Sequence, residues 1–353
     1  MSWRAFLSLV LALICAASLT GCPQDAAPVK LNGQTKLTLL HTSDIHSRLF
    51  PYALQIAQND AALGLGAADS IATVGGVARI ASAVARERAK SDRVLHIDGG
   101  DCFQGAPVFN YYDGEAEVRA LSTMGVDAQV VANHEFDKGA LNARTQFFKW
   151  ADYPVLAANY LLDDPDNPVS PGLETVLQPF TTFNLRGLKV GVIGMGNLSS
   201  LSSLYERPSR LGITPLETID VAQAYIDLLR PLVDVIVFVT HLGLSSDQEM
   251  IRGTTGIDVV LGGHNHIVLQ PPQVVADCAR ADAAGQHYIS LKDADGHPTQ
   301  RECHPRNVLL AHSGAFSKYL GRLDVLLSNQ PGDLEFPYDP LNGFEIASHQ
   351  YTV

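Results

Sequence analysis

Five short polar segments of the sequence carry side chains that could bind metal ions. They cover residues 41–46, 98–101, 133–137, 240–243 and 262–266, and each contains histidine, carboxylate or asparagine side chains. Carboxylate, imidazole and amide oxygen ligands suit manganese, iron, cobalt or zinc better than calcium. Asp44 and His46 are two residues apart, as are His264 and His266, so each pair points to one side of an extended segment. Together these segments predict a metal site.

Each polar segment directly follows a short apolar run that is typical of a buried strand. These runs are rich in β-branched residues, and with one more they cover residues 37–40, 94–97, 128–132, 190–193, 235–239 and 259–261. Helical stripes lie between them, with apolar residues three or four apart over 77–84 and 219–229. This alternation predicts an α/β fold with mostly parallel strands. Functional residues in such sheets gather beyond the carboxyl ends of the strands.

Length and composition narrow the function classes. The chain has 353 residues, of which 46% are hydrophobic, enough for a large buried core. Its net charge of −12 argues against a protein that wraps nucleic acid. Five cysteines are too few for a disulfide scaffold.

The N-terminal segment indicates export from the cytoplasm. Arg4 precedes an apolar stretch over 5–17, which is typical of a secretory signal peptide and short for a membrane span. Residues 19–22, LTGC, resemble the lipobox of bacterial lipoproteins, which predicts a signal peptide over 1–21 and a lipid on Cys22. An ordinary signal peptide is the alternative. Residues 22–35 are then a lipidated tether on the extracytoplasmic side of the bacterial cell envelope.

The polar segments, in their order along the chain, resemble those of the calcineurin-like metallophosphoesterases. The closer resemblance is to the catalytic domain of the bacterial 5'-nucleotidase family, which includes UDP-sugar hydrolases and 2',3'-cyclic phosphodiesterases. Residues 39–46 (LLHTSDIH) resemble the opening of that domain, 133–137 (NHEFD) its signature and 318–324 (KYLGRLD) its closing strand. The resemblance covers residues 36–328.

The resemblance implies a single-domain, four-layer α/β/β/α sandwich with two divalent metal ions. Asp44, His46 and His266 would bind one ion. The other would bind to three further side chains: Asn133, His241 and His264. Asp101 would bridge the two ions, and Asp98 is the rival residue for that role.

The same resemblance assigns His134 to the phosphoryl group and pairs it with Asp137. Two such ions could hold a bridging hydroxide and support in-line attack at phosphorus. His134, oriented by Asp137, could stabilise the developing charge and donate a proton to the leaving group. The alternative for this pair is a cap interaction at the start of a helix.

The sequence departs from the family after the closing strand. Nucleotidases of the family carry a second, C-terminal domain that recognises the base, whereas only residues 329–353 follow here. These residues lack helical or strand periodicity and are expected to form an irregular tail. Either one domain suffices in this protein, or the sequence stops short of a longer one.

A second departure is an insertion over residues 270–306. In an oxidising compartment, Cys278 and Cys303 would most simply form a disulfide. A small zinc site that also uses the histidines of the insertion is the alternative. The insertion follows the 262–266 segment directly, so we expect it to shape the mouth of the site.

These observations favour a metal-dependent phosphomonoesterase that hydrolyses extracytoplasmic nucleotides or similar phosphorylated metabolites. A cyclic-nucleotide or other phosphodiesterase, or a thiosulfohydrolase-type relative, could use the same pair of ions. The non-enzymatic alternative is a lipid-anchored surface-binding protein on a phosphatase scaffold, and the complete set of candidate ligands argues against it.

Overall fold

The computed structural model describes residues 31–167, 169–200, 208–293, 295–333 and 343–353. The expected signal peptide and Cys22, with most of the tether, lie outside these residues. Among the helices within the described ranges, none is long and apolar enough to cross a membrane.

Two mixed β-sheets form the centre of the molecule. The first has seven strands in the spatial order β20 (Glu345–Thr352), β19 (Gly321–Ser328), β1 (Gln34–Thr42), β4 (Val94–Asp98), β5 (Ala128–Val130), β6 (Val155–Leu156) and β8 (Leu177–Gln178). The second has six strands in the order β14 (Gln273–Ala276), β18 (Asn307–His312), β13 (Val259–Gly262), β12 (Val235–Thr240), β10 (Leu188–Met195) and β9 (Phe180–Leu185).

The strands that precede the polar segments are parallel within each sheet. In the first sheet, β1 pairs in parallel with β4, and β4 with β5. In the second sheet, β10, β12 and β13 are parallel neighbours. The carboxyl ends of β1, β4 and β5 therefore share one edge of the first sheet, and those of β12 and β13 share one edge of the second.

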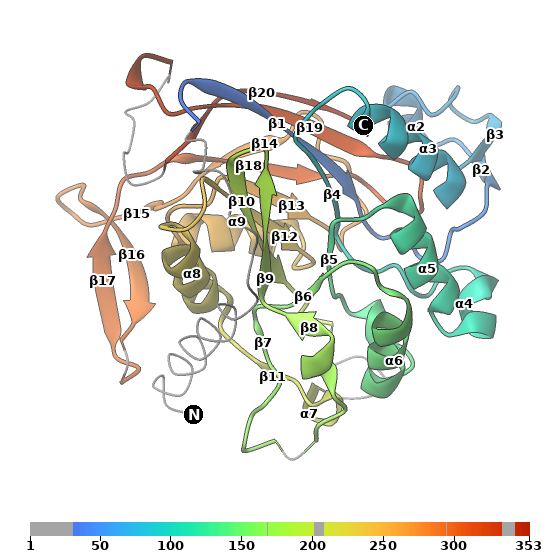
Figure 1. Ribbon diagram of the computed structural model, residues 1–353, viewed down its shortest axis with the longest axis horizontal. Helices are drawn as coiled ribbons and strands as arrows, with labels where there is room; N and C mark the ends of the chain where they lie inside the picture. Colours follow the sequence, from blue (N-terminus) through green and yellow to red (C-terminus); the bar gives the residue numbers. More distant parts are fainter. Residues whose placement is uncertain (1–30, 168, 201–207, 294, 334–342) are drawn as a thin grey trace, which may run out of the picture.

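Helices cover the outer face of each sheet, and Figure 1 shows them on opposite sides of the strands. One outer layer contains α3 (Val77–Arg88), α5 (Glu115–Met124) and α6 (Ala140–Trp150), and the other contains α8 (Thr218–Leu229) and α9 (Leu244–Gly253). The two sheets bury a shared core that includes Leu39, Ile97, Val192, Val237 and Leu261. The fold is the predicted four-layer α/β/β/α sandwich, and α3 and α8 confirm the two helical stripes.

The predicted irregular tail is wrong in its last part. Residues Glu345–Thr352 form β20, which pairs antiparallel with β19 at the edge of the first sheet. Phe344 and Tyr351 are buried in the core between the sheets. The Tyr351 hydroxyl donates to the carbonyl of His312 at 3.1 Å and lies 3.1 Å from the Ser313 hydroxyl. The C-terminal strand is therefore part of the domain.

Replacement of Tyr351 by alanine is expected to lower the free energy of unfolding by about 3 kcal/mol, because a large buried ring is lost from the core. Tyr351→Phe keeps the ring and loses only the hydroxyl, so its expected cost is about 1 kcal/mol. Urea unfolding of the full chain measures both values. Unchanged unfolding of Tyr351→Ala would show that β20 does not contribute to stability.

The insertion lies elsewhere than predicted. β14 runs antiparallel to β18 at the edge of the second sheet. After it, residues 280–302 form a small sheet of β15 (Arg280–Ala281), β16 (His287–Lys292) and β17 (Pro298–Glu302). The amide of Cys278 donates to the carbonyl of Thr254, which precedes β13, and Arg301 pairs with Asp227 of α8 at 2.7 Å. Figure 1 shows the hairpin beside α8. β14 carries the chain to the sheet edge opposite the metal-ligand segments, so the small sheet of β15, β16 and β17 lies away from the mouth of the site.

The predicted disulfide between Cys278 and Cys303 is present. The two residues are 25 positions apart, so the bond stabilises the fold by about 3–4 kcal/mol in the chain-entropy model. Because both thiols are oxidised, they cannot serve the alternative zinc site. His287, one of the histidines considered for that site, bonds through Nδ1 to the carbonyl of Cys278 at 3.0 Å.

Candidate active site

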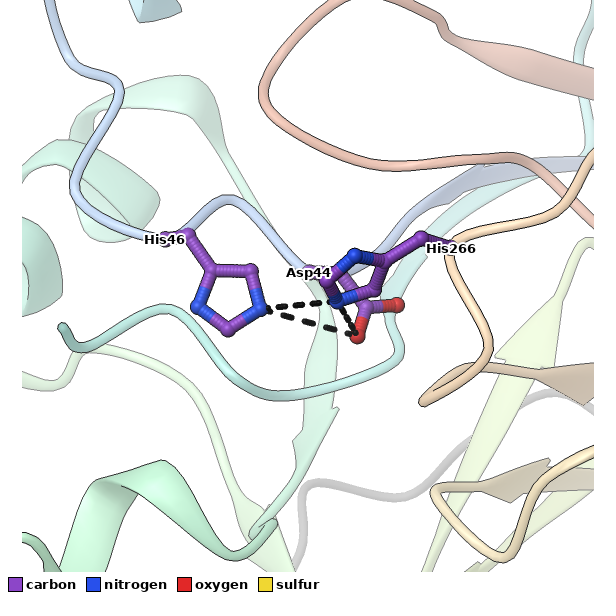
Figure 2. A group of neighbouring side chains, drawn as sticks. All are labelled: Asp44, His46 and His266. Carbon is purple, nitrogen blue, oxygen red and sulfur yellow. Dashed lines mark hydrogen bonds and ion pairs between the residues drawn. The ribbon is translucent and has the colours of Figure 1, made fainter. Parts of the chain in front are cut away.

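The first group of polar side chains joins the two sheets through Asp44, His46 and His266 (Figure 2). His46 Nε2 lies 3.0 Å from His266 Nε2, and His266 Nε2 lies 3.4 Å from Asp44 Oδ1. The third pair, His46 Nε2 and Asp44 Oδ1, is 4.0 Å apart. Three ligand atoms of types that bind divalent metals thus converge, although His46 and His266 lie 220 positions apart in the chain.

Hydrogen bonds orient the side chains of the first group. His46 Nδ1 faces the carbonyl of Gln104 at 3.0 Å, which leaves Nε2 directed into the group. The Asp44 carboxylate accepts from the Ser43 hydroxyl at 2.5 Å and from the amide of His264 at 3.2 Å. The amide of His264 therefore ties the carboxylate from the first sheet to the segment that follows β13 in the second.

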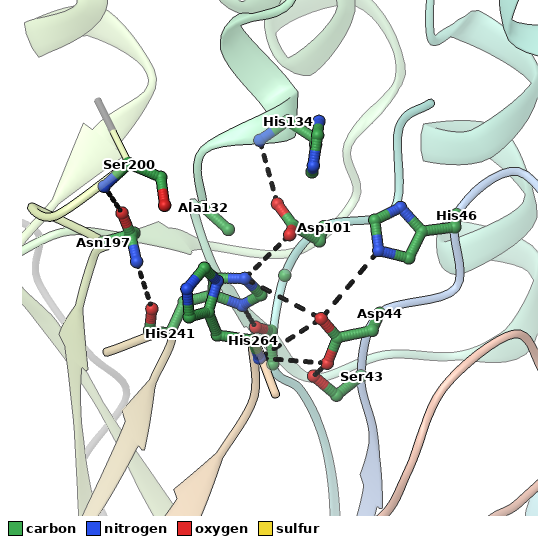
Figure 3. Close-up of polar contacts among 12 residues, drawn as sticks. Ser43, Asp44, His46, Asp101, Ala132, His134, Asn197, Ser200, His241 and His264 are labelled. Atoms are coloured by element: carbon green, nitrogen blue, oxygen red, sulfur yellow. Dashed lines mark hydrogen bonds and ion pairs between the residues drawn. The ribbon is translucent and has the colours of Figure 1, made fainter. Parts of the chain in front are cut away.

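The second group contains Asp101, His241 and His264 (Figure 3). His241 Nε2 lies 2.8 Å from Asp101 Oδ2 and 3.8 Å from Asp44 Oδ1, so it links the two groups. His241 Nδ1 faces the carbonyl of Gly99 at 2.6 Å. One ligand atom from each member of the group lies within 4.8 Å of the others.

Asn133 supplies a further test of whether this site fits a metal. Its side-chain Oδ1 atom is buried, and it has no hydrogen-bond partner among the described residues. An amide oxygen buried in this way costs free energy unless something binds it. Asn133 is adjacent to His134, whose amide donates to Asp101 Oδ1 at 2.9 Å. The donor set and this unpaired oxygen fit a divalent ion.

The ionisation of His241 is linked to that of the two carboxylates beside it, Asp44 and Asp101. Burial alone would raise the pKa values of Asp44 and Asp101, but the positive charge of His241 together with side-chain hydrogen bonds lowers both. Burial would lower the pKa of His241, but the charges of Asp101 and Asp44 raise it to about 10. A metal ion needs neutral imidazole, so ion binding at His241 would release a proton.

His134 and Asp137 form the predicted pair. His134 Nδ1 lies 2.9 Å from Asp137 Oδ2, and His134 begins the short 3₁₀ helix η1 (His134–Phe136). The Asp137 carboxylate bonds the imidazole ring, and Asp137 follows η1, so the pair is not a helix-start cap. Burial would lower the pKa of His134, but the hydrogen bond with Asp137 and the charge of Asp101 raise it to about 9. The imidazole is suited to donate a proton.

Asp98, the rival for the bridging position, lies outside both groups. Its carboxylate accepts from the Thr42 hydroxyl at 2.7 Å, the amide of Gly100 at 3.0 Å and the side chain of Gln129 at 3.2 Å. Burial raises the pKa of Asp98 to about 7. These contacts occupy both oxygens of the Asp98 carboxylate without a metal ion.

Two residues without a predicted role, Glu135 and Phe316, also lie at this site. Glu135 lies in the 133–137 segment, and its carboxylate binds several backbone amides near Asp101. The ring of Phe316 lies 5.5 Å from that of His46 and 4.9 Å from that of His266. Phe316 lies just beyond the carboxyl end of β18, which is parallel to β13. That position after a parallel strand was a signal that could have identified it.

Comparisons with known proteins give consistent findings. The calcineurin-like phosphoesterase family model matches residues 37–268. The chain is 29% identical to a snake venom 5'-nucleotidase of Crotalus adamanteus over 317 residues, which cover 88% of this chain and 48% of that protein. It is 31% identical to a snake venom 5'-nucleotidase of Naja atra over 307 residues, which cover 84% of this chain and 51% of that protein.

A solved structure shows the same similarity. The crystal structure of a 5'-nucleotidase precursor from Thermus thermophilus matches with a TM-score of 0.66 and 25% identity. The match covers 90% of this chain and 54% of that one. This chain therefore spans about half the length of the relatives that it matches.

Proposed function

The chain belongs to the calcineurin-like phosphoesterase family, and on that basis we propose that it is a metal-dependent phosphomonoesterase that hydrolyses nucleotides. The observation that carries the proposal is the convergence of two ligand groups next to the His134–Asp137 pair. The similarity to 5'-nucleotidases supports a nucleotide as substrate.

Asp44, His46 and His266 would hold one divalent ion, and Asn133, His241 and His264 would hold the other. Asp101 lies beside both groups, since one of its carboxylate oxygens meets His241 and its backbone carbonyl accepts from the amide of His46. It is the residue that we assign between the two ions. Two divalent ions held by these residues would supply Lewis-acid stabilisation of the charge that develops on a phosphoryl group, and would make water a competent nucleophile at neutral pH.

The protein's own contribution is orientation and proton transfer. Asp137 fixes the ring of His134 through Nδ1, which leaves Nε2 free to meet a phosphoryl oxygen or the leaving oxygen. The raised pKa of His134 keeps its imidazole protonated at neutral pH, so the ring can donate a proton to the departing alkoxide. Bound cations would lower this pKa, and the negative charges of Asp101 and Asp137 oppose that effect.

We further propose a lipid-anchored position outside the cytoplasm of a bacterial cell. The disulfide in the insertion supports an oxidising compartment. The candidate lipid attachment residue, Cys22, lies outside the described residues. Recovery of the Cys22→Ala protein in the membrane fraction, in the same amount as wild type, would exclude this anchor.

Hydrolysis assays of the full chain with added Mn²⁺ test the proposed function. We expect turnover of nucleoside monophosphates that disappears when EDTA removes the metal and returns when Mn²⁺ is restored. Turnover confined to bis(p-nitrophenyl) phosphate or cyclic nucleotides would replace the proposed activity by a phosphodiesterase. If no metal ion supported hydrolysis of any of these esters, the enzymatic proposal would fail.

A further inference from the structure

The carboxylate of Glu135 is fully buried and binds four backbone amides. Oε1 accepts from the amides of Cys102 at 2.7 Å and Phe103 at 3.4 Å. Oε2 accepts from the amides of Ala132 at 2.8 Å and Asp101 at 3.2 Å. Three of these four amides belong to the segment that carries the candidate bridging residue, Asp101.

Two ligands of the first group, Asp44 and His46, bind the other side of the same segment. The carbonyl of Gly100 accepts from the amide of Asp44 at 2.9 Å, and the carbonyl of Asp101 accepts from the amide of His46 at 3.0 Å. Residues 100–103 therefore lie between Glu135, which binds the amides of residues 101–103, and the Asp44–His46 segment, which binds the carbonyls of Gly100 and Asp101. A shift of residues 100–103 would move three candidate ligands together.

Asp101 and Glu135 also bind each other's segments reciprocally. The amide of His134, next to Glu135, donates to Asp101 Oδ1, and the amide of Asp101 donates to Glu135 Oε2 (the first bond is drawn in Figure 3). Asp44, His46 and Asp101 all have positive φ angles, of 52°, 48° and 54°. Residues other than glycine adopt this conformation only when surrounding contacts impose it.

We propose that Glu135 is a positioning residue for both ion sites, and this inference rests on the metal-dependent function proposed above. Its two oxygens, each accepting from two amides, fix the backbone on which Asp101 stands, and through residues 100–103 they fix Asp44 and His46. Glutamine cannot replace it, because its NH₂ group would face amide donors in place of an acceptor. Aspartate keeps both acceptors but is shorter by one methylene group.

Titration of the metal-free full chain with Mn²⁺ by calorimetry tests this role. Replacement of a residue that orients metal ligands typically lowers metal affinity by about 10- to 100-fold. We therefore expect Glu135→Gln to weaken Mn²⁺ binding by that factor. We expect kcat at saturating Mn²⁺ to fall while KM changes little, because the ligands are misplaced even when the ions are bound. Glu135→Asp is expected to lie between Glu135→Gln and wild type.

Asp258→Asn is the matched control for loss of a buried carboxylate. Asp258 accepts from the amide of Ile236 at 2.7 Å and pairs with Arg230 at 2.9 Å, and it precedes β13, at the edge opposite the ligands. We expect this variant to lose stability and to keep wild-type Mn²⁺ affinity.

Wild-type affinity and kcat in Glu135→Gln would overturn the proposal. If circular dichroism shows Glu135→Gln to be unfolded, wild-type Mn²⁺ affinity and kcat in Glu135→Asp would overturn the proposal. Wild type that binds no Mn²⁺ would instead refute the proposed function itself.

Discussion

Replacement of Asp101 by alanine is expected to reduce phosphatase activity by about 10³-fold or more, because two-ion stabilisation of the transition state contributes several kcal/mol. Asp101 lies 2.8 Å from His241 and accepts from the amide of His134, so its loss removes a carboxylate that contacts both the second ligand group and the His134–Asp137 segment. The replacement also leaves the buried charge of His241 without its closest carboxylate. Activity on nucleoside monophosphates, measured over a range of Mn²⁺ concentrations, gives the size of the effect.

Metal content distinguishes loss of ligands from loss of fold in this experiment. We expect bound Mn²⁺, measured by mass spectrometry of metals after dialysis, to fall from two ions per chain in wild type to one or none in Asp101→Ala. Asp98→Asn is the control, because Asp98 is also a buried carboxylate and it lies outside both ligand groups. Two retained ions in Asp101→Ala would contradict its assignment between the ion sites.

Replacement of His134 by alanine is expected to lower kcat by about 10²- to 10⁴-fold, the usual contribution of a positioned general acid. The amide of His134 still donates to Asp101 in this variant, and His134 belongs to neither ligand group. Bound Mn²⁺ should therefore stay at the wild-type level while turnover is lost. His304→Ala is a suitable control, because His304 is exposed in the insertion and belongs to none of the candidate metal groups.

The pH dependence of kcat gives an independent measure of the role of His134. A general acid works while it is protonated, so kcat should fall as the pH rises through the pKa of His134 in the enzyme–substrate complex. Asp137 raises this pKa, and Asp137→Asn should therefore move the alkaline fall of kcat to lower pH. Identical pH profiles for wild type and Asp137→Asn would contradict the pairing, whatever the effect on kcat at neutral pH.

Much of the fold was predictable from residue patterns. The apolar runs at 37–40, 94–97, 235–239 and 259–261 lie within β1, β4, β12 and β13, since buried parallel strands require continuous apolar sequence. Polar residues that follow such strands meet at one edge of the sheet, because parallel strands all end there. The resemblance of these segments to a known family then indicated partners for each residue, and the structure brings together Asp44 with His46 and His266, and Asp101 with His241 and His264.

The C-terminal strand could not be predicted in the same way. Residues 345–352 read EIASHQYT, with no regular alternation of apolar and polar residues, because β20 is an edge strand with several exposed positions. What fixes this segment is the open edge of β19 and the buried site that receives Tyr351, and neither is visible in the local sequence. The position of the insertion was mispredicted for a related reason, since β14 runs antiparallel to β18 and carries the chain away from the ligand edge before the small sheet begins.

Residue patterns alone therefore established the α/β class, the strand ends and the chemical types of the ligands, all of which depend on periodicity and on residues close together in the chain. The folded chain was needed to show that His46 Nε2 lies 3.0 Å from His266 Nε2, and that one carboxylate at Glu135 binds four amides from two loops. The first arrangement depends on how the two sheets stack, and the second on which backbone groups are left to be satisfied in the loops after β4 and β5.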